Sequence, residues 1–211
     1  MTSGFTPPLR WRQYQTPKRG LSTTEMEDVV RGDEQSGCFA VADGATQTLR
    51  AGRWATLLTE RFIAEPIFPA SPDEWAEWLK PIRQQWWQEI REIQLPWYAE
   101  HKLPDGAGAT LVGFCLRTDQ TWQALAIGDA CLLLWRQDEL VVSFPISDPT
   151  AFTNRPSLIS SHAEATELLP QAANGTWQAG DRFLLMTDAT AQWFLAETTA
   201  QRPPWPAIEV L

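Results

Sequence analysis

Three short apolar runs in the sequence each end in an aspartate. The runs CFAVA, ALAIG and RFLLMT lead directly into Asp43, Asp129 and Asp188. Continuous apolar runs of this length, bounded by glycine or polar residues, predict buried strands. Each carboxylate must then be paired, hydrogen-bonded or bound to a cation, because an unpaired buried charge costs more than the burial of the strand returns. Together with Glu27 and Asp28 upstream, these acids predict one shared site rich in oxygen ligands.

The first part of the chain predicts a strand pair. Residues 26–30 and 38–42 are strand-like and flank the polar turn RGDEQSG. Antiparallel pairing of these strands would place Glu27 and Asp28 near the end of the strand that carries Asp43.

Two amphipathic helices are predicted next. Apolar residues recur at spacings of three and four over residues 49–63, before Pro66. The second helix begins at Ser71, an N-cap residue followed by proline and two acids, and is expected to kink at Pro81 and to end before Pro96. The chain has 12 tryptophans, and those of the second helix lie at core positions, which favours packing over stacking against a sugar or a base.

The second half of the chain predicts short strands joined by tight turns. The strand-like segments are residues 106–116, 121–128, 131–135, 140–143 and 182–187, and residues 191–200 are expected to form a closing helix. The first four of these strands predict an antiparallel meander. Residues 145–170 lack a clear period and are interpreted as a long surface excursion with a short helix over residues 163–169. The lead-in of 20 residues is expected to contain an edge strand over residues 9–14.

Composition indicates a globular protein with one domain over residues 1–211. The chain is 44% hydrophobic, and no apolar run approaches the roughly 20 residues of a membrane span. Without a secretory signal in the N-terminal residues, a soluble cytoplasmic protein is expected. The net charge of −9 and the lack of a basic stretch argue against a nucleic-acid partner. Cys38, Cys115 and Cys131 lie in apolar runs, so we expect buried thiols rather than a disulfide or metal ligands.

The clustered acids carry the candidate chemistry. The two histidines, His101 and His162, are distant from the acids in sequence, which leaves few ligands for a zinc site. A site made of oxygen ligands suits Mg²⁺ or Mn²⁺. The alternative interpretation is that the aspartates are turn residues, because aspartate before glycine is a common turn dipeptide.

Five motifs resemble, in order and spacing, those of the metal-dependent protein phosphatases of the type 2C (PPM) family. They are E-D, F-A-V-A-D-G, G-A-G-A-T-L, A-I-G-D-A and G-D-R-F-L-L-M-T-D-A, and they run from Glu27 to Asp188 and its neighbours. The resemblance implies an α+β fold, a sandwich of two antiparallel β-sheets flanked by α-helices on both faces. It also implies a two-metal site at one end of the sandwich.

The resemblance implies the roles of the site residues as well. The expected metal-site residues are Glu27, Asp28, Asp43, Gly44, Asp129 and Asp188. Asp43 would bridge two Mg²⁺ or Mn²⁺ ions, Gly44 would offer its carbonyl oxygen, and Asp188 would bind the first metal. The E-D pair would hold metal-bound waters, and Asp129 would belong to a third, weaker metal position. Asp43 and Asp188 are thus the expected catalytic residues.

The implied function is that of a hydrolase in signalling, a protein phosphatase acting on phosphoserine or phosphothreonine. Two such ions lower the pKa of a bridging water and clamp the phosphoryl oxygens, so that a hydroxide attacks phosphorus in line. The partner is then a phosphorylated protein, with no nucleic-acid or membrane partner expected.

Departures from the family pattern favour an alternative function. Thr23 occupies the position of a phosphate-binding arginine, and the sequence leaves the phosphate-binding residue unassigned. The cations that could replace it are Arg10, Arg12, Lys18 and Arg19. Ala45-Thr46-Gln47 stands where many members have a histidine or a glycine-rich run. The alternative is a degenerate pseudophosphatase that acts as a binding or regulatory module.

The C-terminal region departs from the pattern too. After Asp188 the acids are Glu197 and Glu209, and neither lies in the D-N motif that the family places on a final strand. The sequence therefore predicts a chain shortened at its C-terminus relative to the family, without the final helix and strand.

Overall fold

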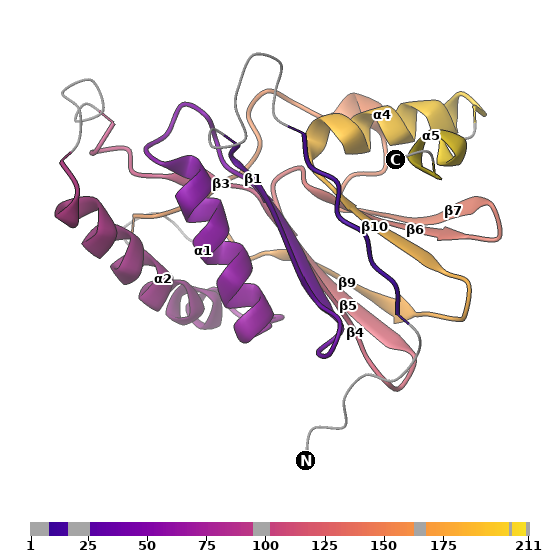
Figure 1. Cartoon of the computed structure of the whole chain (residues 1–211), viewed down its shortest axis with the longest axis horizontal. Coiled ribbons are helices and arrows are strands. Elements are labelled where there is room, and N and C mark those ends of the chain that lie inside the picture. Colours follow the sequence, from indigo (N-terminus) through magenta and orange to yellow (C-terminus); the bar gives the residue numbers. More distant parts are fainter. Residues whose placement is uncertain (1–8, 17–25, 95–101, 163–167, 203, 210–211) are drawn as a thin grey trace.

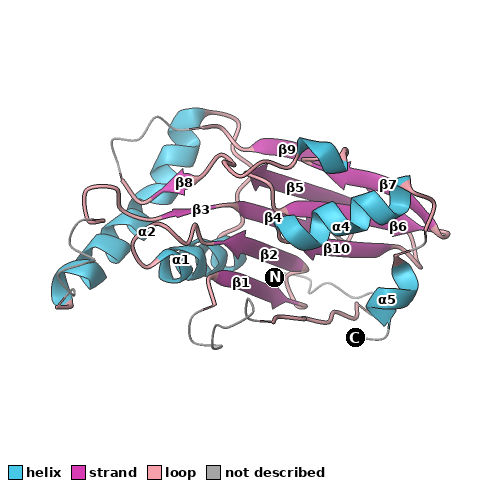
Figure 2. Ribbon diagram, turned by 90° about the horizontal axis from the view of Figure 1, so that it is seen from above, coloured by secondary structure: helices cyan, strands magenta, loops and turns pink. Residues whose placement is uncertain are grey.

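The protein is a layered sandwich of two antiparallel sheets with helices on both outer faces (Figure 1 and Figure 2). The computed structural model describes residues 9–16, 26–94, 102–162, 168–202 and 204–209. This α+β architecture confirms the fold class predicted from the sequence. No helix in the described part of the chain is long and apolar enough to cross a membrane.

The larger sheet contains five antiparallel strands. In spatial order they are β1 (Asp28–Asp33), β2 (Cys38–Asp43), β4 (Leu111–Leu116), β5 (Thr121–Ile127) and β9 (Gln171–Thr176). The sequence pattern does not predict strand β9, because its residues, QAANGT, are largely polar and exposed. As the partner of β5, it ends this sheet.

The smaller sheet contains three antiparallel strands, β10 (Arg182–Met186), β6 (Cys131–Arg136) and β7 (Glu139–Phe144), in that order. A short ladder joins β3 (Gly108–Ala109) to β8 (Ile159–Ser160). The predicted four-stranded meander is wrong, because the chain changes sheets between β5 and β6. This change of sheet takes place at Gly128 and Asp129.

Two long helices cover the larger sheet and two shorter ones the smaller sheet (Figure 1). They are α1 (Ala51–Ala64), α2 (Pro72–Glu92), α4 (Asp188–Thr199) and α5 (Trp205–Glu209). The N-terminus of α2 is capped as predicted: Ser71 Oγ accepts a hydrogen bond from the backbone N–H of Glu74, 3.2 Å away. Pro81 lies inside this helix, and Pro96 lies outside the described residues.

Strand β2 shows why the central strands are apolar on both faces. Phe39 and Val41 point into the core between the sheets, whereas Cys38, Ala40 and Ala42 point toward the core beneath α1 and α2. Successive side chains of a strand point to opposite faces, so a strand in the middle layers must be apolar throughout. The burial predicted for the apolar run before Asp43 is therefore confirmed.

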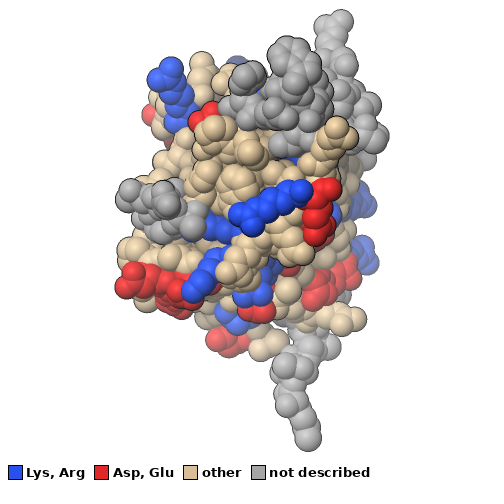
Figure 3. All heavy atoms as spheres, turned by 90° about the vertical axis from the view of Figure 1, so that its left-hand side faces the viewer, with Lys and Arg blue, Asp and Glu red and all other residues tan. Residues whose placement is uncertain are grey.

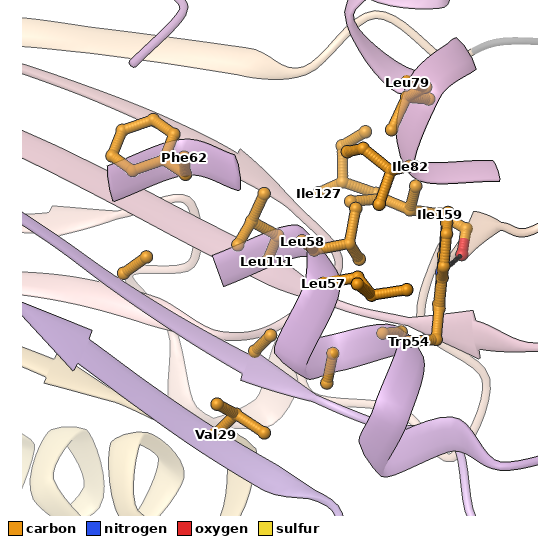
Figure 4. Close-up of a cluster of buried hydrophobic side chains, with 14 of the residues drawn as sticks. Val29, Trp54, Leu57, Leu58, Phe62, Leu79, Ile82, Leu111, Ile127 and Ile159 are labelled. Atoms are coloured by element: carbon orange, nitrogen blue, oxygen red, sulfur yellow. Dashed lines mark hydrogen bonds between the residues drawn. The ribbon is translucent and has the colours of Figure 1, made fainter. Parts of the chain in front are cut away.

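The core beneath α1 and α2 contains the tryptophans of α2. Trp75, Trp78 and Trp86 are at most 6% exposed, which confirms that they pack in the interior. Figure 4 shows side chains of α1, including Trp54, directed toward those of α2 and the sheet. The Trp54 indole N–H donates to the carbonyl of Ile159 at 2.8 Å, and this hydrogen bond anchors the segment of β8 to the helix layer. The outer surface of the molecule on the side of α2 carries acidic and basic residues interspersed among uncharged ones (Figure 3).

The cysteines differ from expectation. Cys38 and Cys115 occupy directly paired positions of β2 and β4, with Cα atoms 4.1 Å apart, and their sulfurs form a disulfide. The prediction of three free thiols is therefore wrong for this pair and correct only for Cys131, which is buried. The pairing joins residues 77 positions apart, a proximity that strand register creates and residue spacing does not reveal.

The segments without clear periodicity also differ in part. Residues 9–16 contain no strand, although Leu9 and Trp11 pack against the core between the sheets. The excursion after β7 includes a 3₁₀ helix, Pro149–Ala151, and strand β8, and it buries Ile159 and Ser161. It is therefore not wholly a surface loop. Of the helix predicted over residues 163–169, residues 163–167 lie outside the described part of the chain.

Candidate metal centre

The first two acids of the candidate site lie at the same end of β1 and β2. Asp28 and Asp43 are direct partners in the antiparallel register, so their side chains lie on the same face of the sheet. The backbone N–H of Gly44 donates to the carbonyl of Glu27 at 3.2 Å. The predicted pairing, which places Glu27 and Asp28 beside Asp43, is confirmed.

Thr110 joins the end of β2 to the turn that carries Asp129. Its hydroxyl accepts from the backbone N–H of Asp43 at 3.3 Å, and its own N–H donates to the carbonyl of Asp43 at 2.9 Å. Its methyl group lies against Gly128, where a Cβ would come within 2.5 Å of it. Gly128 has φ +93°, so the turn before Asp129 needs glycine both for backbone conformation and for space.

Thr187 joins the N-terminus of α4 to the beginning of β1. Its hydroxyl donates to Asp28 Oδ2 at 3.4 Å, across 159 residues of sequence. Asp188 is the first residue of α4, and its Oδ1 accepts from the N–H of Ala189 at 2.6 Å. A carboxylate is favourable there because the free N–H groups at a helix N-terminus attract negative charge.

These contacts bring five acids from distant parts of the sequence to one end of the sandwich. They come from the start of β1, the end of β2, the turn after β5 and the start of α4. They are Glu27, Asp28, Asp43, Asp129 and Asp188. The convergence of these acids at one end of the sandwich, predicted from three strand-terminal aspartates, is thus what the structure shows.

The electrostatics of this end favour a cation. Asp129 is only 5% exposed; burial, and then the negative charge of Asp188, raise its pKa to about 6. Burial likewise raises the pKa of the Cys131 thiol to about 12, with the charges of Asp129 and Asp188 acting in the same direction. Asp28 Oδ1 is buried and has no hydrogen-bond partner within the described residues. A bound cation would supply this oxygen with a partner and relieve the repulsion between the carboxylates.

The donor set fits a hard, hydrated ion. Carboxylates and a backbone carbonyl are the ligands of Mg²⁺ and Mn²⁺, and Mg²⁺ commonly takes one or two carboxylates while it keeps several waters. The acids lie as two neighbouring pairs, Asp28 with Asp43 and Asp129 with Asp188. Within the described residues no three His, Cys, Asp or Glu side chains come together as a ready-made metal-binding group. Carboxylate and carbonyl oxygens of this kind suit a hard ion that keeps part of its water.

The other residues considered from the sequence lie elsewhere. The ring of His162 packs against that of Trp87 in a tilted arrangement, with centroids 5.2 Å apart, and Glu197 forms an ion pair with Arg202 at 2.6 Å. Arg10 and Arg12 are exposed in the irregular lead-in. The residues outside the described part of the chain include Lys18, Arg19, Thr23 and His101. Glu209 is the last residue of α5.

Two residues that assemble the site, Thr110 and Thr187, are not predicted from the sequence. Both are threonines placed directly before or after apolar strand residues, Thr110 within GAGATL and Thr187 within LLMTD. Their position next to the motifs was a usable signal. Their hydrogen-bonding partners could not be predicted from the sequence, because these partners lie 67 and 159 residues away.

Comparison with known proteins agrees with this arrangement. A family profile described as Protein phosphatase 2C matches residues 23–207. The chain therefore belongs to the protein phosphatase 2C family, whose members in the comparisons below are serine/threonine phosphatases. No curated protein matches the sequence significantly.

Several solved phosphatase structures share the fold. The Mycobacterium tuberculosis serine/threonine phosphatase PstP/Ppp is 20% identical with a TM-score of 0.52, over 80% of this chain and 74% of that one. The serine/threonine phosphatase Stp1 from Staphylococcus aureus is 16% identical with a TM-score of 0.54, over 80% and 72%. The catalytic domain of PstP in complex with two manganese ions is 16% identical with a TM-score of 0.51, over 88% and 90%. At these identities the likeness shows the fold.

Proposed function

We propose that this protein is a Mg²⁺- or Mn²⁺-dependent phosphatase that hydrolyses phosphoserine or phosphothreonine in proteins. The observation that carries the proposal is the convergence of five acids at one end of the sandwich through Thr110 and Thr187. Membership of the family supports it, as does the similarity to a phosphatase domain that holds two manganese ions. One domain carries all of these acids.

The chain offers oxygen ligands for two ions and a third, weaker position. The residues that would hold them are Glu27, Asp28, Asp43, the carbonyl of Gly44, Asp129 and Asp188. When bound, the ions would supply an acidified water as nucleophile and positive charge against the phosphoryl oxygens. Asp43 and Asp188 are proposed as the carboxylates on which activity depends most.

The protein's own groups would hold this arrangement in place. The two hydrogen bonds between Asp43 and Thr110 fix the backbone at the end of β2. Thr187 fixes one oxygen of Asp28, and the other is buried without a hydrogen-bond partner among the residues that the structure describes. Preorganised ligands of this kind bind a cation without first having to be ordered.

The second candidate is a degenerate phosphatase that binds a partner without turnover. The observation that favours it is that no three acids form a compact group within the described part of the chain. Such a protein would keep the fold and some affinity for cations while it lacked activity.

Activity assays on the wild type separate the two functions, and the Asp43→Asn variant tests the proposed site. Hydrolysis of p-nitrophenyl phosphate and of a phosphothreonine peptide should require added Mn²⁺ or Mg²⁺ and should fall at least a hundredfold in this variant, because one ligand charge is removed. The matched control is Asp138→Asn, an exposed turn residue at φ +65°, a conformation that asparagine tolerates. A wild-type chain that binds Mn²⁺ in calorimetry but hydrolyses neither substrate would favour the degenerate alternative, and an active Asp43→Asn protein would rule out the proposed site.

A further inference from the structure

A surface cavity of about 430 Å³ opens beside Asp129. Its wall is formed by the end of β5 with the following turn, and by parts of the segment between β7 and β9. The residues that line the cavity include Asp129, Ile146, Arg155, Leu168 and Leu169. A volume of this size accommodates a small ligand or one or two side chains of a peptide.

Close packing fixes the segment that carries Arg155 against the candidate metal centre. A Cβ at Gly128 would come within 2.8 Å of the carbonyl oxygen of Ser157. Ser157 is two residues beyond Arg155, and Gly128 directly precedes Asp129. Pro156 restricts the backbone between them. Arg155 is therefore held on the same rim of the cavity as Asp129.

Arg155 gives this rim its positive charge. Among the described residues that line the cavity, it is the only lysine or arginine, and Asp129 is the only acid. A phosphate group that approaches a cluster of carboxylates is repelled by them unless cations compensate. A guanidinium group is well suited to this task, because its planar set of N–H donors binds two phosphate oxygens at once.

Another part of the wall is apolar. Leu168 and Leu169 are 49% and 44% exposed, an unusual exposure for two consecutive leucines, and Ile146 lines the same cavity. Exposed apolar groups beside a charged one favour a ligand that has both characters. A phosphorylated residue with an apolar neighbour in the same polypeptide meets this description.

We propose that the cavity binds the phosphorylated segment of a protein substrate, with Arg155 in contact with the phosphate. Leu168, Leu169 and Ile146 receive an apolar side chain next to the phosphorylated residue. This inference rests on the proposed phosphatase function and adds to it a phosphate-binding residue and a preference for apolar neighbours.

Binding to phosphonate analogues of phosphothreonine peptides tests the proposal without hydrolysis. Fluorescence anisotropy of the full chain in Mn²⁺ would compare a peptide with leucine beside the phosphonate and the same peptide with glycine there. We expect the leucine peptide to bind severalfold more tightly. Arg155→Ala should weaken binding of both peptides at least tenfold, and Arg155→Lys should weaken it less. The double variant Leu168→Asn, Leu169→Asn should abolish the difference between the peptides.

The controls are two other exposed arginines. Arg91 lies on α2, on the outer side of the larger sheet. The Arg91→Ala variant should therefore bind both peptides like the wild type. Arg12→Ala tests the lead-in as a competing source of the phosphate contact. The proposal would be overturned if Arg155→Ala kept the wild-type peptide affinity, or if Arg12→Ala caused the larger loss of affinity. It would also be overturned if the wild type bound neither peptide.

Hydrolysis of p-nitrophenyl phosphate distinguishes failure of the phosphatase function from failure of the proposed peptide-binding site. A wild-type chain that binds the peptides as expected but hydrolyses nothing would overturn the phosphatase function and support the binding site. A wild-type chain that hydrolyses phosphate esters, together with an Arg155→Ala variant of unchanged peptide affinity, would retain the phosphatase function and overturn the binding site.

Discussion

Asp129 shows how one residue reports on the state of the candidate metal centre. It is buried in the turn between the two sheets, and it faces the negative charge of Asp188. Both effects disfavour its ionised form and raise its pKa to about 6. A carboxyl whose pKa is higher in the folded than in the unfolded state stabilises the fold only at low pH. That contribution is complete below the unfolded value, about 3.8, and is lost as pH rises through about 6.

We therefore expect Asp129→Asn to be more stable than the wild type in metal-free buffer at pH 7.5, by about 3 kcal/mol. The difference should shrink as pH falls from 6 toward 4, because the wild-type carboxyl then becomes neutral. Urea unfolding in EDTA at several pH values measures it, with Asp138→Asn as the control for loss of an exposed carboxylate. Equal stability of Asp129→Asn and wild type at pH 7.5 would show that this carboxyl is not under electrostatic strain. In saturating Mn²⁺ the advantage of the variant should disappear.

At the scale of elements, α1 and α2 are joined by charge as well as by their apolar faces. Arg53 of α1 donates two hydrogen bonds to the carboxylate of Glu89 on α2, at 2.7 and 2.6 Å. The hydrogen bonds from Arg53 lower the pKa of Glu89 to about 2. The side chains are 31% and 35% exposed, so solvent screening reduces the effect to about 1 kcal/mol of stability.

Replacement of Glu89 by glutamine should lower the unfolding free energy by about 1 kcal/mol at pH 7. A carboxyl with a lowered folded pKa stabilises the fold at pH values above its unfolded pKa, 4.5, and this stabilisation is lost as pH falls toward 2. The gap between variant and wild type should therefore close between pH 4.5 and pH 2. Thermal unfolding over this range checks it, with Glu77→Gln as the control, because Glu77 is 74% exposed in its pair with Lys80. A gap that stays constant down to pH 2 would contradict the interpretation.

Elements also differ in how visible they were in the sequence. Strands β2, β4, β5 and β6 are apolar on both faces, so their runs predicted strands. Strand β9 pairs with β5 through its backbone at the edge of the sheet, and its side chains are small, polar or exposed. Backbone hydrogen bonds do not depend on side-chain pattern, which is why β9 left no periodic signal.

For the whole molecule, the acid cluster makes stability depend on cations. The acids come from the larger sheet, from the turn between the two sheets and from α4, so a bound ion would connect elements that unfolding separates. An ion that binds only the folded state stabilises it by about 2.7 kcal/mol at a hundred times its dissociation constant. We expect saturating Mn²⁺ to raise the urea midpoint of the wild type by that order. The increase should be largely lost in Asp43→Asn and retained in Asp138→Asn. An increase of the same size in all three proteins would place the ion elsewhere.

The resemblance of five motifs to a phosphatase family implied the layered class of the fold, and the sequence by itself determined the helices α1, α2 and α4 and the acids of the candidate site. It could do so because burial on two faces, helical periodicity and strand-terminal aspartates are local patterns in the chain. The tertiary structure decided the change of sheet after Gly128, the pairing of Cys38 with Cys115, and the hydrogen bonds of Thr110 and Thr187. It also placed Arg155 beside Asp129. Each of these depends on which strands lie next to each other, and strand register between residues far apart is set by the packing of the whole core rather than by neighbouring residues.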